Sequence, residues 1–374
     1  MNLSWDDSKS YLLLNPSYPK SEQERFNRIL KMAQAWPGHI WLSTSGSSVQ
    51  KWVGLSKQAL LISAQAVNQH LNSDKDDRWV NALPFFHVGG LGIWARAYLS
   101  GAKVYDFRQH HPGKWQAEEF YRYMQQVQGT LSALVPTQLH DLLALGQRPP
   151  TSLRALIIGG GTLLPHLYEK AVDLGWPVLP SYGLTECASQ VATASLDSWW
   201  QKNPTLQLLS HIQACEREGR LCFAGASLLS TYAYLHNQDV QFVDPKIQGW
   251  LVSEDRGAVQ QGELTIWGRS DAIVKVGGEN VDLTHLESHL ETLRLQMAVE
   301  AELTLIAMPD TRLGHSIHLV SNCLNQESIA PLIETFQHRV LPFERIRKIH
   351  FLSQFPRSPL GKILKNALID LLSK

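Results

Sequence analysis

Short apolar segments alternate with helix-like segments through the middle of the chain, and this alternation restricts the fold more than any other feature. The apolar segments are WVNALPFF, AKVYDF, GTLSALV, LRALIIGGG and WPVLPSYG, most of which end in Gly, Pro or Ser. Segments with helical spacing, such as TQLHDLLALG, follow them. The pattern predicts an α/β fold with a substantial parallel sheet. Such sheets bind ligands at the carboxyl ends of their strands, where the Gly-, Ser- and Thr-rich segments of this chain fall.

Two further helices are predicted closer to the N-terminus. In SEQERFNRILKMAQAW, helical spacing places four apolar residues on one face: Phe26, Ile29, Leu30 and Ala33. SKQALLISAQAVNQHL is the second, with Ser56 as its N-cap. Between them the apolar HIWLS leads into TSGSSVQKW, residues 44–52, which predicts a strand followed by a loop of small hydroxylated residues. Such a loop is either an ordinary turn or a cradle for phosphate oxygens.

The pattern changes near residue 249. GWLVSEDRGAV and GELTIWGR are typical of short antiparallel strands, and AIVKVGG predicts a strand before a helix that opens at THLE. Thr284 and Glu287 have the spacing of a capping box in that helix. The strands ELTLIAMPD, SIHLV and KIHFL and a last amphipathic helix follow. We therefore predict a large α/β domain over residues 1–269, with mixed and parallel sheets, and a small α+β domain over residues 270–374.

Charge and composition exclude several classes of protein. The 374 residues include 34 basic and 34 acidic ones, so no global field holds a nucleic acid backbone. The segment MNLSWDDSKSYLLLNP is not a signal peptide, and no apolar run approaches the ~20 residues that span a bilayer. The cysteines lack metal-ligand or redox spacing, which favours a cytoplasmic protein without disulfides. They are Cys187, Cys215, Cys222 and Cys323.

Four polar segments next to apolar strands are candidates for chemistry: TSGSSVQKW, IIGGGTLLP, PSYGLTE and FPRSPLGKIL. Each has a structural alternative, because a Ser/Gly loop is usually a turn and glycines after a strand usually form a tight connection. Glu186 taken alone is a carboxylate at a helix start, and Lys362 taken alone is a surface lysine. Their joint occurrence in this order favours a binding site.

Competing motifs mostly fail. GGGTLL has Leu164 where a dinucleotide fingerprint needs a third glycine, and no Walker-type phosphate loop is present. FHVGG is similar to an esterase oxyanion loop, but a G-x-S-x-G nucleophile elbow is missing. Ser48 and Lys51 form an S-x-x-K without its S-D-N and K-T-G companions. The histidines have no zinc spacing.

These segments, with GWLVSED and GRSDAIVKVGGENV, resemble the acyl-adenylate-forming enzymes, a superfamily of acyl-CoA synthetases, luciferases and peptide-synthetase adenylation domains. TSGSSVQK is similar to their phosphate loop, SYGLTE to their nucleotide signature and PRSPLGKIL to their C-terminal lysine motif. The resemblance runs from about Trp41 to the end of the chain. LPFFHVGGLGIWARAYLSGAKV, LVPTQLHDLL and YGLTECASQVAT are most similar to o-succinylbenzoate–CoA ligases, which act in menaquinone and phylloquinone biosynthesis.

The resemblance implies two half-reactions. A carboxylate attacks the α-phosphate of ATP and releases pyrophosphate, and the acyl-adenylate then passes its acyl group to the thiol of CoA. Both reactants of the first step are anions, so positioning and charge neutralisation must supply the rate. Glu186 is implied to hold Mg²⁺, Thr185 to bond the α-phosphate, and Lys362 to bridge the two reactants. The implied ATP-binding residues are Thr44, Ser45, Gly46, Ser47, Ser48, Gly160, Gly161, Ser181, Tyr182, Gly183, Asp255 and Arg269.

Among these, Tyr182 is implied to stack on adenine and Asp255 to accept bonds from both ribose hydroxyls. For the second half-reaction, the resemblance implies a mobile C-terminal domain that turns about a hinge at Asp271. The loop with Gly277 and Gly278 then reaches the tunnel of the CoA thiol. The implied acyl-binding residues are His87, Gly159 and Gln190. A hydrogen-bonded structural histidine is an equal alternative for His87.

The chain also departs from the family pattern. Val49 stands where the phosphate loop usually has a glycine, so the role of Lys51 stays open, and SED replaces the usual Thr-Gly-Asp at Asp255. Because the phosphate loop starts near residue 44, we expect a shortened amino-terminal subdomain, in an active monomer or in a homodimer. Alternative functions are an aryl- or short-chain acyl-CoA or acyl-carrier ligase, and a non-catalytic nucleotide-binding homologue.

Overall fold

The computed structural model describes residues 3–16, 18, 20, 23, 26, 35–43, 51–111, 115–236, 239–323, 325–359 and 361–373. Contacts divide the chain into a first unit, Met1–Ser253 with Ala258–Thr265, and a second unit, Glu254–Gly257 with Ile266–Lys374. The predicted phosphate loop from residue 44 to residue 50 lies outside the described residues, as does most of the predicted helix over residues 21–36. The predicted functional boundary after residue 269 stays a prediction.

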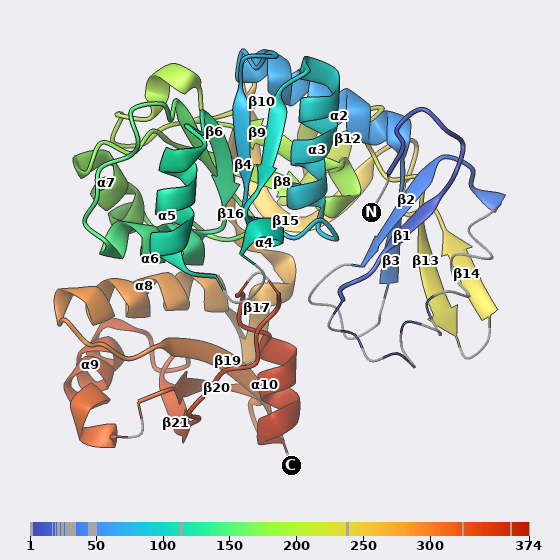
Figure 1. The fold of residues 1–374 in the computed structure, drawn as a ribbon. Coiled ribbons are helices and arrows are strands. Elements are labelled where there is room, and N and C mark those ends of the chain that lie inside the picture. Colours follow the sequence, from blue (N-terminus) through green and yellow to red (C-terminus); the bar gives the residue numbers. More distant parts are fainter. Residues whose placement is uncertain are drawn as a thin grey trace. The chain divides into compact units, whose positions relative to one another are not determined.

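A parallel sheet forms the centre of the first unit (Figure 1). Its five parallel strands, in spatial order, are β5 (Lys103–Asp106), β4 (Arg78–Asn81), β6 (Leu131–Leu134), β7 (Ala155–Ile158) and β8 (Val178–Leu184). Each lies in one of the apolar segments that predicted a strand, so the predicted α/β fold is confirmed. Because consecutive parallel strands need crossover connections, helices lie between them in sequence. These are α3 (Val88–Ser100), α4 (Phe107–His110), α5 (Ala117–Gln126), α6 (Pro136–Ala144) and α7 (Pro165–Asp173).

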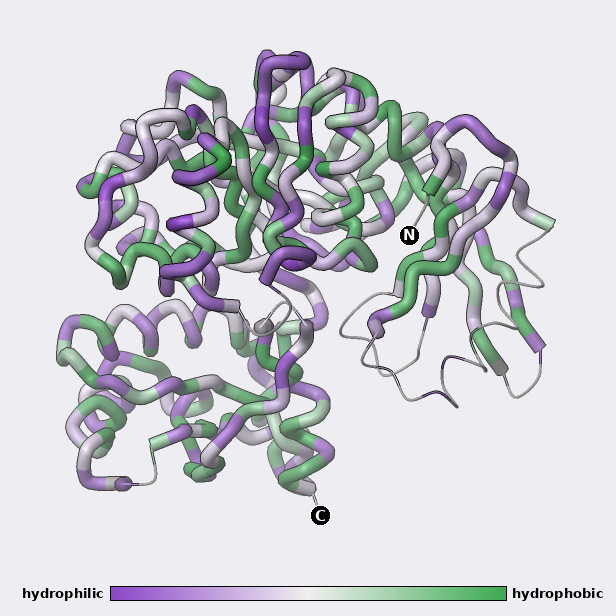
Figure 2. Tube along the Cα trace, viewed as in Figure 1, coloured by the Kyte–Doolittle hydropathy of each residue, from purple (hydrophilic) through white to green (hydrophobic). Residues whose placement is uncertain are grey.

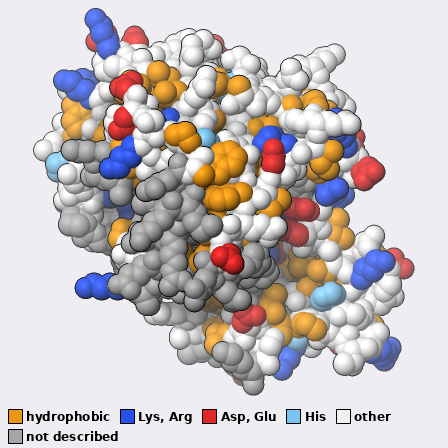
Figure 3. Space-filling model, turned by 90° about the vertical axis from the view of Figure 1, so that its right-hand side faces the viewer, with side chains coloured by type: hydrophobic (Ala, Val, Ile, Leu, Met, Phe, Trp, Pro, Cys, Tyr) orange, Lys and Arg blue, Asp and Glu red, His pale blue; other side chains and the backbone are white. Residues whose placement is uncertain are grey.

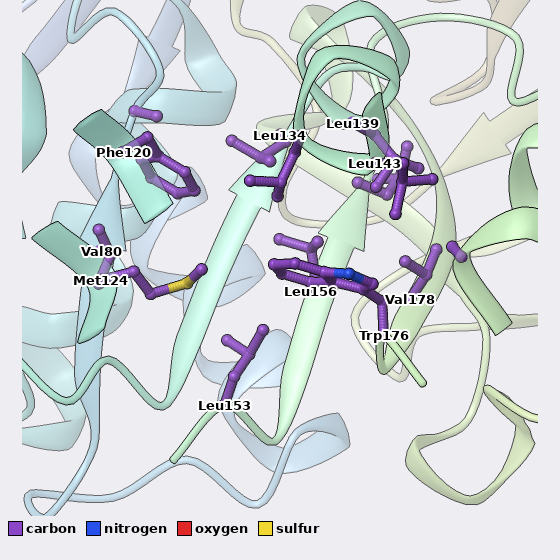
Figure 4. Close-up of a cluster of buried hydrophobic side chains, with 14 of the residues drawn as sticks. Val80, Phe120, Met124, Leu134, Leu139, Leu143, Leu153, Leu156, Trp176 and Val178 are labelled. Atoms are coloured by element: carbon purple, nitrogen blue, oxygen red, sulfur yellow. The ribbon is translucent and has the colours of Figure 1, made fainter. Parts of the chain in front are cut away.

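The main core of the first unit lies between this sheet and α5, α6 and α7 (Figure 4). Phe120 and Met124 of α5 and Leu139 of α6 pack against Leu134 and Leu156 of the strands, and all five are fully buried. Burial of side chains this size contributes about 1.5–3 kcal/mol each. On the other face, α3 and α2 (Lys57–His70) contact each other and the sheet. The N-cap of α2 is Ser56, as predicted, because its side chain accepts the Ala59 N–H at 3.0 Å.

The sheet continues beyond β8 through antiparallel neighbours. After β8 the chain makes the short helix η2 (Thr185–Cys187) and returns as β9 (Ser189–Thr193), antiparallel to β8. The order then runs through β10 (Leu206–Leu208), β16 (Glu263–Arg269), β15 (Leu251–Gln260), β12 (Arg220–Ala224) and β11 (Gln213–Arg217). The short helix η3 (Leu196–Ser198) lies between β9 and β10 in sequence. The sheet is therefore mixed, as predicted.

A second sheet of the first unit contains a strand, β3, that the sequence analysis did not predict. Its strands are β1 (Tyr11–Leu13), β2 (His39–Ser43), β3 (Lys51–Ser56), β13 (Thr231–His236) and β14 (Asp239–Val243). β2 and β3 are antiparallel neighbours, and the segment between them in sequence, residues 44–50, lies outside the described residues, so its predicted role stays a prediction. Sequence reasoning missed β3 because KWVGL directly precedes a strong helix signal. Trp41, Trp52 and Phe26 are fully buried together in this sheet's core.

The second unit has its own sheet and core. The sheet contains β17 (Ile273–Val276), β18 (Glu279–Asp282), β19 (Leu303–Asp310), β20 (Gly314–Ser321) and β21 (Ile346–Phe351). The helices are η4 (Ser270–Ala272), α8 (Leu283–Gln296), α9 (Gln326–Arg339) and α10 (Lys365–Leu372). Leucines along one face of α8 pack with Phe336 of α9 and with strand residues such as Ile317. This arrangement confirms the predicted small α+β fold.

The predicted capping box of α8 is wrong. Asp282 is the N-cap, and its carboxylate accepts the N–H groups of Thr284 and His285 at 3.0 and 3.2 Å. Glu287 instead accepts hydrogen bonds from the Thr304 hydroxyl and the Leu305 N–H, and pairs with Lys365 at 2.6 Å. The earlier carboxylate captures the free N–H groups of the first turn, which leaves Glu287 to join α8 to β19 and α10.

No helix in the described parts of the chain combines the length and apolarity of a bilayer crossing. Hydropathy instead changes over short intervals along the chain (Figure 2). On the face shown in Figure 3, acidic and basic side chains are interspersed. The described residues visible there therefore form no broad region of one charge.

Candidate functional site

Glu186 lies in η2, where the chain turns from β8 to β9. The turn requires unusual backbone, because Ala188 and Ser189 have φ values of 57° and 110°. Such conformations persist only where the surroundings enforce them, and they concentrate at functional sites. The Glu186 carbonyl accepts the Leu229 N–H at 2.8 Å, which fixes the backbone at this point. The sequence thus holds one carboxylate in a strained, anchored turn.

Two side chains from the neighbouring sheet hold the Glu186 carboxylate. The Tyr232 hydroxyl donates to Glu186 Oε1 at 2.9 Å, and the Lys51 ammonium lies 3.4 Å from the same oxygen. Lys51 also lies over the Tyr232 ring, 4.2 Å from its centroid. Lys51 and Tyr232 lie close together because their strands, β3 and β13, are paired. We call Lys51, Glu186 and Tyr232 the carboxylate cluster.

Electrostatics keep the Tyr232 hydroxyl of the carboxylate cluster protonated. Burial and the Glu186 charge raise the pKa of Tyr232, so its hydroxyl remains a donor at neutral pH. Glu186 is 15% and Lys51 25% exposed, so both groups can reach a ligand. Among the described residues, Glu186 Oε2 has no hydrogen-bond partner. One carboxylate oxygen is therefore without a partner among the described residues, and a carboxylate oxygen is the kind of ligand that Mg²⁺ prefers.

Sequence reasoning left the role of Lys51 open and missed Tyr232. The altered loop before Lys51 prevented an alignment, and TYAYLH is indistinguishable from any strand with aromatic side chains. The contact depends on the pairing of β3 with β13, which are separated by more than 170 residues of sequence. The predicted cradle residues Thr44, Ser45, Gly46, Ser47 and Ser48, like Val49, lie outside the described residues.

The strand of the nucleotide signature combines a candidate ligand contact with a packing requirement. The Tyr182 ring lies 6.0 Å from the Phe223 ring, and Tyr182 is half-buried. Gly183 is required by the turn, because a Cβ there would lie 2.0 Å from the Ser189 carbonyl oxygen. The need for glycine at residue 183 is thus explained without a ligand.

Ser181 and Gln190 belong to one buried network. The Gln190 amide donates to Ser181 Oγ at 3.1 Å and to Thr193 Oγ1 at 2.6 Å, while Gln190 Oε1 is buried without a partner in the described structure. An unpaired buried acceptor costs about 1–3 kcal/mol unless a ligand or water donates to it. Ser181, predicted to bind ATP, and Gln190, predicted to bind the acid, thus lie next to each other on β8 and β9.

The three glycines after β7 lie beside the same strand end. Gly160 has φ of +76°, which favours glycine. A Cβ at Gly159 would lie 3.3 Å from the Ser181 carbonyl oxygen. Gly161 would only touch Pro136 at 3.5 Å, so its backbone and space do not require glycine. The structure thus brings Gly159 next to Ser181, as the order of β7 and β8 requires.

His87 is the N-cap of α3 but makes no side-chain capping bond. Its Nε2 is buried without a hydrogen-bond partner in the described residues. Burial, and secondarily the nearby Arg108 charge, lowers the pKa of His87 to about 4, so the ring is neutral at pH 7. The alternative interpretation of His87, a structural histidine held by hydrogen bonds, therefore finds no partner for Nε2 among the described residues.

Arg96 of α3 is a residue that sequence reasoning missed. Its side chain is fully buried, and the guanidinium carbon lies 5.5 Å from the centroid of the Trp79 ring. Arg96 Nη2 lies 3.4 Å from Ser189 Oγ, Nε has no partner, and no carboxylate pairs with the group within the described chain. Burial lowers its pKa to about 9. A buried cation without a counter-ion among the described residues is costly, and an anionic ligand would offset that cost.

In the second unit, Arg269 joins two aspartates. Its Nε and Nη2 bind both Asp271 oxygens at 2.8 and 2.7 Å, and Nη1 lies 3.2 Å from Asp255 Oδ1. The hydrogen bonds from Arg269 lower the pKa of Asp271. Asp255 is buried, whereas Asp271 is exposed. Asp255 and Arg269, predicted to bind ATP, and Asp271, predicted to be the hinge, therefore form one charged cluster.

Lys362 follows a compact turn in the same unit. Its N–H donates to Ser358 Oγ at 3.2 Å, its carbonyl accepts the Ser358 N–H at 2.8 Å, and Gly361 supplies φ of +79°. Desolvation, followed by the positive charges of Arg269 and Lys365, lowers the pKa of Lys362. The residue as a whole is nonetheless solvent-exposed, so the ammonium is available to a ligand.

Gly277 and Gly278 form the two-residue turn between β17 and β18, with φ of +62° and +93°. A Cβ would meet nothing closer than 3.5 Å at either position. Backbone conformation, and not crowding, therefore requires these glycines.

The described residues contain no group of three or more metal-ligand side chains.

A family model described as AMP-binding enzyme matches residues 39–233, more than half of the chain. The 2-succinylbenzoate–CoA ligase of Enterococcus faecalis is 25% identical over 324 residues, which cover 82% of this chain and 64% of that protein. The corresponding Bacillus cereus ligase is 28% identical over 331 residues, or 83% and 65% of the two chains. The chain thus spans less than two thirds of the length of these relatives.

Solved structures give the same picture of the fold. A variant of E. coli MenE with bound OSB-AMS has a TM-score of 0.69 and 26% identity, and the match covers 89% of this chain and 68% of that one. The o-succinylbenzoate CoA synthetase of Bacillus subtilis in complex with OSB-AMP has a TM-score of 0.77, covering 96% and 78%. At 24% identity the latter shows the fold alone.

Proposed function

The chain belongs to the AMP-binding enzyme family, as its ordered motifs predicted, and from this we propose that it is an AMP-forming acid–CoA ligase. The proposed reaction converts 2-succinylbenzoate, ATP and CoA to 2-succinylbenzoyl-CoA, AMP and diphosphate. The observation that carries the proposal is the carboxylate cluster, in which a lysine and a tyrosine hold Glu186 at the end of the nucleotide-signature strand. Relatives with this activity support the choice of acid.

In the first half-reaction, the carboxylate cluster acts on the phosphates of ATP. Lys51 supplies positive charge at the start of β3, and Tyr232 keeps Glu186 oriented with Oε2 open. Glu186 would hold Mg²⁺, which neutralises phosphate charge when it is bound. Thr185, one residue earlier in η2, would bond the α-phosphate. Tyr182 would stack on adenine, and Gly160 and Gly161 would admit backbone contact with it.

The second unit would contribute the ribose contact and the mobile cation. Asp255 would accept the ribose hydroxyls, with Arg269 holding its carboxylate in place. Lys362 would neutralise charge that accumulates between the attacking carboxylate and the α-phosphate. Its lowered pKa leaves it closer to losing its proton than an ordinary lysine, and the nearby aspartates counteract that loss. Asp271 would act as the hinge, and Gly277 and Gly278 as the loop at the CoA thiol.

The acid itself would be recognised by buried groups on α3 and β9. 2-Succinylbenzoate has two carboxylates, of which only one reacts. Arg96 would pair with the other one, because its guanidinium is buried without a counter-ion among the described residues. Neutral His87 and the open Gln190 Oε1 would border the aromatic keto acid. A dianionic acid therefore explains buried polar groups that a fatty acid would leave unpaired.

The proposal is tested by incubating the protein with ATP, Mg²⁺, CoA and a panel of acids while AMP and diphosphate are followed. Product formation with 2-succinylbenzoate and little with benzoate or fatty acids is expected. Turnover only with other acids would overturn the choice of substrate. No turnover with any acid, in a protein that still binds ATP, would favour a non-catalytic nucleotide-binding homologue. The cytoplasmic location and the homodimer stay predictions.

A further inference from the structure

Two cysteines lie directly opposite each other at the edge of the large sheet. β11 and β12 form a hairpin in which Cys215 pairs with Cys222 in register. The hairpin turn consists of Glu218 and Gly219, whose φ values of 53° and 75° are typical of a type I′ turn. The two cysteine side chains therefore emerge on the same face of adjacent strands.

The turn also fixes the kind of pairing at the cysteines. In a two-residue hairpin, the residues that flank the turn, here Arg217 and Arg220, form a hydrogen-bonded pair, and bonded and non-bonded pairs alternate from there. Cys215 and Cys222 are the second pair beyond Arg217 and Arg220 and are again bonded. Bonded pairs have Cα atoms about 5.5 Å apart. Disulfides span Cα separations of about 4.4–6.8 Å, so the Cα spacing admits a bond. The Cβ atoms of directly opposite residues lie about 4.5–5.5 Å apart and must close to about 3.5–4.5 Å, so the bond requires a local movement of the edge strand.

The two thiols differ in access. Cys222 is fully buried, whereas Cys215 is half-buried on β11, which is the edge strand of the described sheet. Burial raises the pKa of Cys222, and its interaction with Cys215 adds to that shift. The nearby charges of Arg217 and Arg220 oppose this rise at Cys222 without reversing it. A small oxidant therefore reaches Cys215 first, and Cys222 is positioned to resolve the product.

We propose that Cys215 and Cys222 form a reversible intramolecular disulfide in response to hydrogen peroxide. Peroxide converts the Cys215 thiol to a sulfenic acid and releases one water. The Cys222 sulfur then attacks that sulfur, forms the S–S bond and releases a second water, so two thiols and one peroxide give one disulfide and two waters. A bond across a short hairpin is strained, which makes it easy to reduce.

The proposed bond lies one residue from Phe223, whose ring packs beside Tyr182. It would restrain β12 next to the side chain that we assign to adenine. This consequence depends on the proposed function, but formation of the disulfide does not. Failure of the ligase assay and failure of the disulfide are therefore separate results.

The experiment treats the native full-length protein with a slight excess of hydrogen peroxide, blocks remaining thiols in denaturant and digests it with trypsin without reductant. Cleavage after Arg217 and Arg220 separates the cysteines, so only a disulfide joins their peptides. The expected result is a loss of two of the four thiols, a mass decrease of about 2 Da and a joined peptide that dithiothreitol releases.

Cys323→Ser is the matched control, and it should form the same joined peptide. Cys222→Ser should stop at oxidised Cys215, without the 2 Da loss, and Cys215→Ser should leave Cys222 reduced. The proposal is overturned if the native protein keeps all four thiols, if Cys215 pairs with another cysteine, or if the joined peptide forms only after unfolding. Equal oxidation of Cys222 in Cys215→Ser would overturn the order of the two steps.

Discussion

The Tyr232 hydroxyl donates a 2.9 Å hydrogen bond to Glu186 Oε1, which ties a tyrosine of the smaller sheet to the carboxylate at the end of β8. Because the same oxygen faces Lys51, the bond directs the second oxygen away from protein partners among the described residues. In the proposed site, a single hydrogen bond would therefore select which oxygen of the carboxylate meets a ligand. We treat this as the organising contact of the proposed adenylation site.

Tyr232→Phe removes only the hydroxyl, so it should free Glu186 to rotate toward Lys51. We expect kcat/KM for acyl-adenylate formation to fall about tenfold, which corresponds to about 1.4 kcal/mol. Diphosphate release under saturating acid measures this change. Tyr234→Phe, on the same strand, should change the rate less than twofold. Equal effects of the two variants would mean that the contact is structural only.

Lys51→Met removes the ammonium next to Glu186 but keeps an unbranched side chain. If Lys51 neutralises phosphate charge in the transition state, the adenylation rate should fall by about 10²–10³. Lys103→Met, at the exposed start of β5, is the charge-matched control and should retain the activity. Steady-state kinetics with varied ATP check both. A Lys51→Met enzyme with unchanged kcat and KM for ATP would remove this residue from the mechanism.

Arg96→Met tests whether the buried guanidinium serves the acid. Replacing an unpaired buried charge with an apolar side chain should leave the free energy of unfolding unchanged or raise it. Loss of a buried charge pair with the substrate should nevertheless raise the KM for 2-succinylbenzoate about 30-fold or more, or ~2 kcal/mol. Urea unfolding and kinetics are measured together, with exposed Arg122→Met as control. A destabilised variant with normal KM would show that Arg96 is structural.

His211 lies between β10 and β11, and both of its ring nitrogens are buried without a hydrogen-bond partner among the described residues, which predicts a pH dependence of stability. Burial lowers its pKa to about 4 in the folded protein, from 6.5 in the unfolded chain. Between these values the unfolded chain binds a proton that the folded one does not, so this contribution is present above pH 6.5 and is lost as the pH falls toward 4. The loss amounts to at most about 3 kcal/mol. The free energy of unfolding of His211→Phe, measured with urea, should therefore fall less steeply between pH 6.5 and pH 4 than that of the unmodified protein. Parallel plots of this free energy against pH for the two proteins would contradict a lowered pKa of His211.

The sequence predicted the parallel strands and their helices correctly, because each apolar segment was short and was followed by a turn residue and a helical pattern. Ser56 was predicted as an N-cap for the same local reason. The prediction failed where two local signals competed. Thr284 and Glu287 had the right spacing, but Asp282 lay closer to the free N–H groups and became the cap.

The residues around the nucleotide signature show a different limit. Glu186 could be proposed from its motif, but Tyr232 and Lys51 reach it only because β3 and β13 pair across the sheet. Arg96 looks like an ordinary helix residue in GIWARAYLS, and only its complete burial marks it. Long-range pairing and burial are set by tertiary packing, which no local pattern records.

Acid-dependent exchange of labelled diphosphate into ATP tests the central proposal most directly, since it reports adenylation without CoA. We predict exchange with 2-succinylbenzoate in the unmodified protein and a loss of about 10²-fold or more in Glu186→Gln. Exchange that is absent with 2-succinylbenzoate but present with another acid, or that persists unchanged in Glu186→Gln, would contradict the proposal.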